Sequence, residues 1–258
     1  MSNLKYYEKM IDMGCFSRED VNTLTGNPAA THSLLYDYVN KGLIERVRRD
    51  LYVTISLETK QPVRNRYAIA SKISDHTYIT HHSAFEYYGC ANQVYYDVYV
   101  GGEKFFSEFN YDGVEYKFVK PHIIDGITSS DNGIMVTDIE RTILDSINDF
   151  EKISGLEELL KCIALVPSVK EDILLKYLKQ YNRKFLYQKT GYILEHFKDI
   201  LNLSNSFFKE CLRNIPFSKC YLYKTKFKNE LVLDTKWNMY VPEDLFLLTD
   251  KGVKYDTI

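Results

Sequence analysis

The sequence predicts an α+β protein with a small N-terminal domain followed by a larger, mixed one. In residues 1–60, three short segments with helical spacing precede two β-prone runs. Between residues 61 and 150, short strand-like runs alternate with short helical segments, and residues 156–213 are mostly helical by periodicity. Gln61-Pro62 marks the expected boundary. The expected domains are therefore 1–60 and 61–258, the second containing mixed α/β and helical parts with a possible boundary near residue 150.

The first two helices are bounded by residues that favour helix ends. Residues 4–13 place apolar side chains at helical spacing and stop before Gly14, a good residue for a helix C-terminus. Ser17 is a favourable N-cap, and Asp20, three residues later, is the acidic partner that often accompanies one. We therefore expect a second helix that starts at Ser17 and stops at Gly26.

A third helix and a β-hairpin complete the N-terminal domain. Asn27 is a favoured N-cap and Pro28 suits the first helical position, so a helix is expected over about residues 28–41. Residues 43–47 and 51–55 are β-prone. Three helices, the last two joined by a tight turn, followed by a hairpin, is the order of a winged helix-turn-helix.

One face of the third helix has the features of a base-reading surface. With Leu35 at the centre of the buried side, Thr31, Tyr38 and Val39 fall on that side. The opposite side has small residues near its N-terminus, which allow entry into the major groove, followed by hydrogen-bonding groups. The candidate base-reading residues are Asn27, Ala29, Ala30, His32, Ser33 and Tyr36.

Arginine is concentrated near this helix. Six of the nine arginines lie at or before position 66, and a planar guanidinium binds phosphates and base edges well. Arg46, Arg48 and Arg49 lie in the hairpin, and wings of this kind usually contact phosphate or the minor groove. The alternative is a small helical domain whose third helix and arginine-rich turn are only solvated.

The rest of the chain is expected to alternate short helices and strands. Helices are predicted at 63–74, 83–88 and 138–147, and strands at 94–100, 114–119 and 134–136, with Thr137 as a helix N-cap. Pro167 separates the first helix of residues 156–213 from the next. Three β-prone runs, at 221–224, 230–233 and 237–241, end the sequence.

Four parts of the chain resemble segments of one known family. They are the wing-like stretch KGLIERVRRDLYV (41–53), YITHHSAFEYYG (78–89), VTDIERTILD (136–145), and GYILE (191–195) together with Trp237. In order, they are similar to the wing signature, a strand-then-helix segment, the most recognisable internal motif and the C-terminal half of the AbiEi antitoxins. Asp50 stands where this family commonly has Gly, and Thr190 where Arg is more usual.

The resemblance implies a transcriptional regulator of a type IV toxin–antitoxin system. Such a protein represses its own operon by binding double-stranded DNA upstream of its gene. The resemblance also implies a functional partner, a nucleotidyltransferase-like toxin, which is counteracted through the C-terminal domain without a stable complex. A role in phage defence follows from the same resemblance.

A second class of function, a nuclease targeted by the N-terminal domain, has its own candidate residues. Asp138 and Asp145 lie about two turns apart on one expected helix, so with Glu140 they could face a metal-binding cleft. The favoured interpretation is instead an ion pair between Arg141 and Asp145, four residues apart. Neither a Gly-rich phosphate loop nor a Gly-x-Ser-x-Gly motif is found. We therefore expect no catalytic residue and no cofactor.

The histidines near the middle of the chain do not predict a metal site. His81 and His82 are adjacent, with His76 and Cys90 nearby. Neighbouring residues on a strand point to opposite faces, so the pair is not expected to share a metal ion.

A basic segment lies farther along the chain. Residues 176–189 contain no acid, and Lys176, Lys179 and Arg183 would share one helical face. This face is either solvated or a surface for an anionic partner. With Lys184, these residues form the candidate antitoxin surface.

Composition points to the cytoplasm. No apolar run approaches the ~18 residues that would cross a bilayer, and the N-terminus lacks the apolar segment of a signal peptide. Five scattered cysteines, an odd number without a C-x-x-C pair, are typical of reduced thiols. We expect a cytoplasmic protein with no membrane partner.

Overall fold

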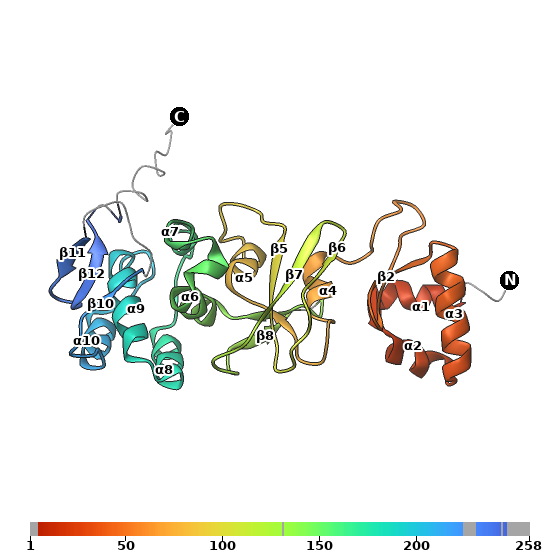
Figure 1. The fold of residues 1–258 in the computed structure, drawn as a ribbon, viewed down its shortest axis with the longest axis horizontal. Helices are drawn as coiled ribbons and strands as arrows, with labels where there is room; N and C mark the ends of the chain where they lie inside the picture. The colour runs from red at the N-terminus through yellow and green to blue at the C-terminus, as the bar shows by residue number, and fades with distance from the viewer. Residues whose placement is uncertain (1–4, 131, 224–230, 244, 247–258) are drawn as a thin grey trace, which may run out of the picture. The chain divides into compact units, whose positions relative to one another are not determined.

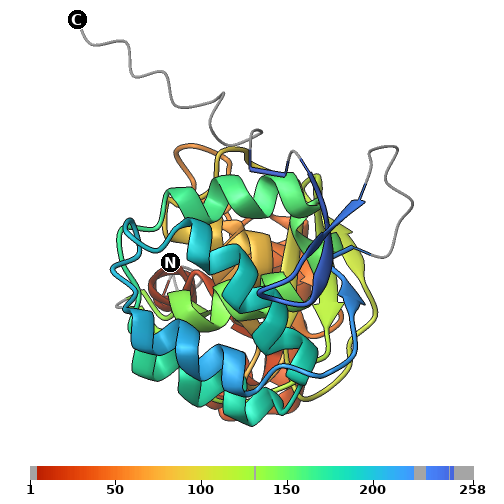
Figure 2. The ribbon, with the colours of Figure 1, turned by 90° about the vertical axis from the view of Figure 1, so that its left-hand side faces the viewer.

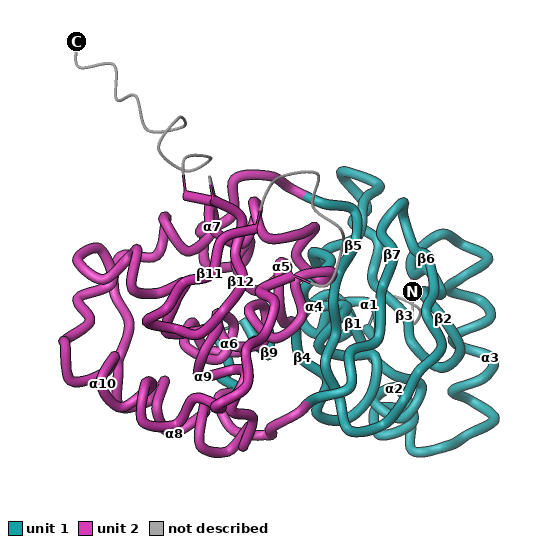
Figure 3. Tube along the Cα trace, turned by 60° about the vertical axis from the view of Figure 1, so that its left-hand side comes forward, with its two compact units in different colours: residues 1–79, 95–121, 127–136 teal, residues 80–94, 122–126, 137–258 magenta. Residues whose placement is uncertain are grey.

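The computed structural model describes residues 5–130, 132–223, 231–243 and 245–246 (Figure 1). The chain divides into two compact units, coloured separately in Figure 3. Unit 1 comprises Met1–Ile79, Tyr95–Pro121 and Ile127–Val136, and unit 2 comprises Thr80–Val94, His122–Gly126 and Thr137–Ile258. Residues 60 and 150, near which boundaries were expected, each lie inside one unit. The predicted α+β class is confirmed.

The N-terminal part of unit 1 is a winged helix-turn-helix, as predicted. Its elements follow the order α1 (Lys5–Met13), β1 (Cys15–Ser17), α2 (Arg18–Thr25), α3 (Pro28–Asn40), β2 (Ile44–Arg48) and β3 (Leu51–Thr54) (Figure 1). The three strands form an antiparallel sheet in the order β1-β3-β2. The sequence did not predict β1, which is too short to show an alternating pattern.

The predicted helix boundaries are confirmed by capping contacts. The backbone N–H of Asp20 donates to the Ser17 side chain at 3.1 Å, and the Ser17 N–H donates to the Asp20 carboxylate at 2.7 Å. Gly26 ends α2 with a left-handed φ of 68°. The Asn27 side chain accepts hydrogen bonds from the first turn of α3, at 2.9 and 3.2 Å. The two helices are thus joined by a tight turn.

The winged helix has its own core, formed by Tyr7, Met10, Phe16, Val21, Leu35, Tyr38, Ile44 and Tyr52. Thr31, Leu35 and Tyr38 are buried on α3 as predicted, but Val39 is exposed. In the last turn of α3 the ring of Tyr38, and not the side chain of Val39, occupies the core, where it packs edge-to-face on Tyr7.

The rest of unit 1 is built on a six-stranded mixed sheet. Its order is β6 (Phe109–Tyr111), β7 (Val114–Val119), β5 (Asp97–Gly101), β4 (Tyr78–Ile79), β9 (Met135–Thr137) and β8 (Ile127–Ser129). Strands β5 and β7 are parallel, as are β4 and β9. The helix expected at 63–74 is only α4 (Arg66–Ala70), because Asn65 caps its N-terminus and Ser71 ends it. The sequence did not predict the short strands β6 and β8.

Unit 2 is mostly helical. It contains α5 (His81–Tyr87), α6 (Ile139–Asn148), a 3₁₀ turn (Phe150–Ile153), α7 (Leu156–Ala164), α8 (Glu171–Tyr181), α9 (Lys184–His196) and α10 (Asn205–Arg213). A small sheet in the order β10 (Cys220–Tyr221), β12 (Met239–Pro242), β11 (Leu231–Asp234) lies at the edge of these helices (Figure 2). Leu4, Lys224 and Glu230, at the ends of expected elements, lie outside the described residues.

Helix α6 is the centre of unit 2. Every residue from 140 to 147 is buried, and the helix packs against α5, α8 and α9. Its N-cap is Asp138 rather than Thr137, because the Asp138 carboxylate accepts the Arg141 backbone N–H at 2.8 Å. None of the described helices is both long enough and apolar enough to cross a membrane.

Candidate functional site

The outer face of α3 is exposed as the sequence predicted. The surface residues include Asn27, Ala29, Ala30, His32, Ser33 and Tyr36. Tyr36 is 67% exposed, so its ring is accessible on this face. Lys41 forms an ion pair with Asp37 at 2.6 Å, which offsets the one acid on this helix. The face therefore presents small, hydrogen-bonding and aromatic groups, with little net negative charge.

The turn of the wing contains an aspartate, Asp50, in a backbone conformation that favours glycine. Asp50 has a φ of 61°, at the position where the resembled family commonly has Gly. Its carboxylate pairs with Arg18 at 3.2 Å and with Arg49 at 3.5 Å. Because all three side chains are about half exposed or more, these pairs are open to solvent and to competition by a phosphate.

The three wing arginines do not have the same surroundings. Arg46 and Arg49 are exposed, and Arg49 keeps 88% of its side-chain surface. The guanidinium of Arg48 instead lies over two rings of unit 1, 5.5 Å from the centre of Phe106 and 5.0 Å from that of Phe109. Burial there lowers the pKa of Arg48 from its usual value. Arg48 packs the wing against neighbouring residues, so Arg46 and Arg49 are the better placed to meet a phosphate.

A second contact fixes the same strand of the wing. The Tyr111 hydroxyl of β6 donates to the Glu45 carboxylate of β2 at 2.7 Å. This hydrogen bond and the packing of Arg48 on Phe106 and Phe109 together fix the position of the wing. No local sequence pattern indicates this contact, because the two partners lie 66 residues apart.

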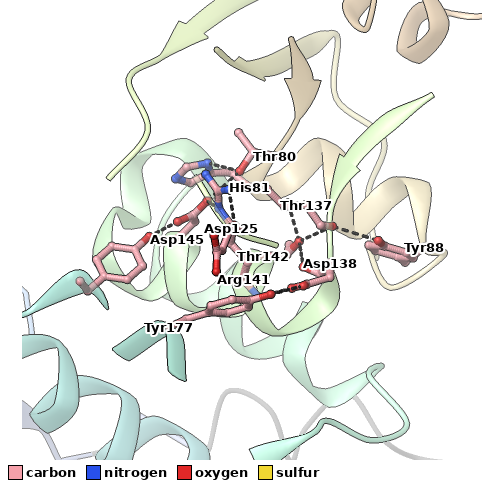
Figure 4. Close-up of polar contacts among 11 residues, drawn as sticks. Thr80, His81, Tyr88, Asp125, Thr137, Asp138, Arg141, Thr142, Asp145 and Tyr177 are labelled. Carbon is pink, nitrogen blue, oxygen red and sulfur yellow. Dashed lines mark hydrogen bonds and ion pairs between the residues drawn. The ribbon is translucent and has the colours of Figure 1, made fainter. Parts of the chain in front are cut away.

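A buried polar centre joins two of the family-like segments within unit 2 (Figure 4). Thr80, in the segment 78–89, donates to the Asp145 carboxylate of the segment 136–145 at 3.1 Å. Arg141 pairs with Asp145 at 3.3 Å and donates to the backbone oxygen of Asp125 at 2.6 Å. Burial raises the pKa of Asp145 to about 6, although Arg141 and Thr80 act in the opposite direction.

Two tyrosines of α8 complete this polar centre. Tyr181 donates its hydroxyl hydrogen to Asp145, and Tyr177 donates to Asp138 at 2.5 Å. Both tyrosines are buried. Their spacing of four residues indicates that both side chains lie on one face of the helix. Nothing in the nearby sequence indicates their acceptors, Asp138 and Asp145, which are 39 and 36 residues away.

These contacts favour the structural interpretation of the acidic residues over the nuclease alternative. The predicted ion pair between Arg141 and Asp145 is confirmed. Asp138 caps α6, and Glu140 accepts the backbone N–H of Lys170 at 2.8 Å. Each carboxylate is therefore used by donors of the protein itself. Within the described parts of the chain, these three acids do not form a metal-binding group.

The basic segment is exposed, but it is not one continuous helix face. Asn182, with a φ of 51°, ends α8, so Lys176 and Lys179 lie on α8 and Arg183 and Lys184 lie at the start of α9. Lys176 pairs with Asp125 at 2.7 Å, and Arg183 donates to Asn148 at 3.0 Å. Lys179 and Lys184 are exposed at the same junction. The prediction of a single acid-free stripe is therefore corrected to a charged junction with one acid beside it.

The fold and the exposed face of α3 define a protein of the winged helix-turn-helix class. Residues 10–55 match the model of a family described as "Transcriptional regulator, AbiEi antitoxin". The resemblance stated from the sequence motifs is confirmed over this segment, and the match supports a role as a DNA-binding antitoxin.

A solved structure has a similar fold over most of the chain. The crystal structure of the RV2827C protein from Mycobacterium tuberculosis covers 92% of this chain and 89% of its own, with a TM-score of 0.61. The two sequences are 13% identical, so the likeness shows the fold alone. No curated protein matches the chain.

Proposed function

We propose that this chain is a cytoplasmic, non-enzymatic transcriptional regulator that represses its own operon and acts as the antitoxin of a toxin–antitoxin pair. The observation that supports this most directly is the exposed outer face of α3, within the segment that matches the antitoxin regulators. A helix whose outer face is small and polar, capped at its N-terminus and followed by a wing with exposed arginines, suits the major groove.

In this proposal, different parts of the winged helix have different tasks. Ala29 and Ala30 let the N-terminus of α3 approach the DNA, while His32, Ser33 and Tyr36 read base edges. Arg46 and Arg49 contact phosphate and fix the orientation of the domain. Asn27 contributes mainly by capping α3, because its side-chain oxygen accepts two backbone N–H groups. Arg48 contributes by holding the wing in place.

The antitoxin activity is assigned to unit 2. The toxin is expected to be nucleotidyltransferase-like, and it is counteracted without a stable complex. The charged junction, formed by Lys176, Lys179, Arg183 and Lys184, is the proposed surface. The buried hydroxyls of Tyr177 and Tyr181 hold α8 on α6, so the lysines of α8 are presented outward on a fixed helix. Counteracting a toxin in this way would serve phage defence.

Footprinting tests the regulatory part of this proposal. The full-length protein should protect a repeated sequence upstream of its own gene at concentrations that leave unrelated DNA unprotected. The absence of any protected site in that region would contradict autorepression. A reporter controlled by the same DNA should be repressed by the native protein and derepressed by a variant with Ser33 and Tyr36 replaced by Ala.

A further inference from the structure

A buried cluster in unit 2 contains the three side-chain types that bind zinc. His82 lies in the first turn of α5, and Glu158 and Cys162 lie one turn apart on α7. Their candidate ligand atoms all lie within 4.8 Å of one another. His82 Nε2 is 3.3 Å from Glu158 Oε1, and Cys162 Sγ is 3.6 Å from the same oxygen. The three residues are 1%, 5% and 0% exposed.

The two distances to the Glu158 oxygen fit the edges of a zinc coordination tetrahedron. Zinc binds histidine nitrogen and carboxylate oxygen at about 2.0–2.2 Å and cysteine sulfur at about 2.3 Å. Tetrahedral angles then separate nitrogen from oxygen by about 3.4 Å and oxygen from sulfur by about 3.6 Å. The third pair, His82 nitrogen and Cys162 sulfur, lies within 4.8 Å, and a shared zinc ion needs these two atoms about 3.6 Å apart, so binding would draw them together by at most about 1.2 Å.

The second nitrogen of His82 has the surroundings expected of a metal ligand. Nδ1 lies 3.2 Å from Oε1 of Glu86, one turn later on α5, and both side chains are buried, but the angle between them is not that of a hydrogen bond. Metal-binding histidines generally direct their other ring nitrogen to a carboxylate or carbonyl, which fixes the ring and its tautomer. With a metal bound, a small rotation of the ring would bring Nδ1–H onto Glu86 and fix Nε2 toward Glu158 and Cys162.

Helix α7 is oriented so that both of its candidate ligands face inward. On its outer side, Lys161 pairs with Glu157 at 2.8 Å, and both remain partly exposed. Glu158 and Cys162 are buried. The side chain of His81 has different surroundings from that of His82. His81 is the first residue of α5, with a φ of 53°, and its Nδ1 lies 3.1 Å from the Thr80 hydroxyl. The strand expected for the two histidines is instead part of α5.

We propose that His82 Nε2, a carboxylate oxygen of Glu158 and Cys162 Sγ bind a Zn²⁺ ion that ties α5 to α7. Three protein ligands leave one position for the second Glu158 oxygen or for water. On binding, Zn²⁺ replaces the thiol proton of Cys162, which is released to solvent, and the Zn–S bond forms.

Metal analysis of the full chain tests this site. Protein purified without a histidine tag from zinc-containing medium should hold close to one zinc ion per chain. Cys162→Ser should lower the bound zinc at least about tenfold. The matched control, Cys211→Ser, removes another fully buried thiol of unit 2 and should keep the metal. Protein grown with Co²⁺ should show a thiolate-to-cobalt charge-transfer band in the native chain and in Cys211→Ser.

The outcomes separate a zinc site from a hydrogen-bonded cluster. Glu86→Gln keeps all three ligands and should weaken zinc affinity about 10- to 100-fold. A native chain without bound metal and without the cobalt–thiolate band would overturn the proposal, as would a folded Cys162→Ser variant that holds as much zinc as Cys211→Ser. If Cys162→Ser does not fold, the native cobalt spectrum and the affinity of Glu86→Gln decide.

Discussion

The indole ring of Trp237 lies directly against Gly191. A Cβ atom at position 191 would come within 2.0 Å of ring atom Cη2, closer than any real contact. The indole Nε1 donates to the Glu195 carboxylate at 2.9 Å, one turn farther along α9. Gln188, on the same side of α9, donates to the backbone oxygen of Trp237 at 2.6 Å. The glycine, the glutamate and the tryptophan noted for their family resemblance thus form one packed unit.

Replacing Gly191 by Ala should destabilise unit 2. The added methyl group must displace a fully buried tryptophan, and overpacking of this kind costs typically about 1–3 kcal/mol. Urea denaturation followed by circular dichroism measures the change. As a control, Trp237→Leu removes the outer ring atoms, so adding Gly191→Ala to it should cost much less than in the native chain. Equal costs in the two backgrounds would show that the contact does not limit position 191.

The wing arginines should differ in their effect on the salt dependence of operator binding. Arg49→Ala should reduce the slope of log K against log salt by ~0.9, because one phosphate contact is lost. Arg48→Ala is the matched control: its guanidinium lies over Phe106 and Phe109, so the slope should stay close to the native value while thermal stability falls. Fluorescence anisotropy at several salt concentrations measures the slope. A larger loss of slope for Arg48→Ala than for Arg49→Ala would reverse these assignments.

Side chains on the outer face of α3 should determine base preference. Ser33→Ala and Tyr36→Ala should each reduce discrimination at particular operator positions by about 1–3 kcal/mol, since a lost base contact affects only the sequence it reads. A panel of single-base operator variants measures this for each protein. Equal weakening on every DNA, including unrelated DNA, would move these residues off the recognition surface.

The histidine that starts α5 should make the protein sensitive to acid. Burial lowers the pKa of His81 to about 3, against about 6.5 in an unfolded chain. As the pH falls below about 6.5, the unfolded state takes up this proton first, so the free energy of unfolding falls by up to about 1.4 kcal/mol per pH unit. Asp145 acts in the opposite direction: its raised pKa makes the folded state take up a proton between about pH 6 and pH 4, which adds stability as the pH falls.

A variant separates these two contributions. His81→Gln should reduce the loss of stability below about pH 6.5, and His122, whose pKa is also lowered by burial, accounts for part of the remainder. The exposed His32 provides the control, and His32→Gln should keep the native pH profile. Urea denaturation at a series of pH values is the measurement. A native profile in His81→Gln would mean that this imidazole is not the group that titrates.

The sequence predicted the N-terminal domain more fully than the polar centre of unit 2, for a physical reason. Ser17, Gly26 and Asn27 act on backbone groups within four residues, so their effect on helix ends can be inferred from a short stretch of chain. The partners of Asp145 are 65 residues away at Thr80 and 36 away at Tyr181. No local pattern contains such a pairing. The same holds for Arg48, whose packing against Phe106 changes its expected role.

The charged junction can be tested without disturbing its supporting contacts. Lys176→Glu would place a negative charge beside Asp125, and Arg183→Glu would break the contact with Asn148. Lys179 and Lys184 are both exposed, so they are the better positions for charge reversal. Exposed substitutions of this kind usually change stability by no more than ~0.5 kcal/mol each.

The double variant Lys179→Glu/Lys184→Glu should fail to protect cells against the cognate toxin and still bind the operator. Reversing two charges changes the local potential toward an anionic partner, whereas the winged helix is unaltered. Operator affinity should stay within about threefold of native, under ~0.7 kcal/mol. Lys120→Glu/Lys209→Glu makes the same change in net charge at exposed positions elsewhere and should protect fully. Toxin rescue in cells and gel shifts with the same proteins measure the two activities. Full rescue by a folded Lys179→Glu/Lys184→Glu variant would show that the junction is only a solvated surface.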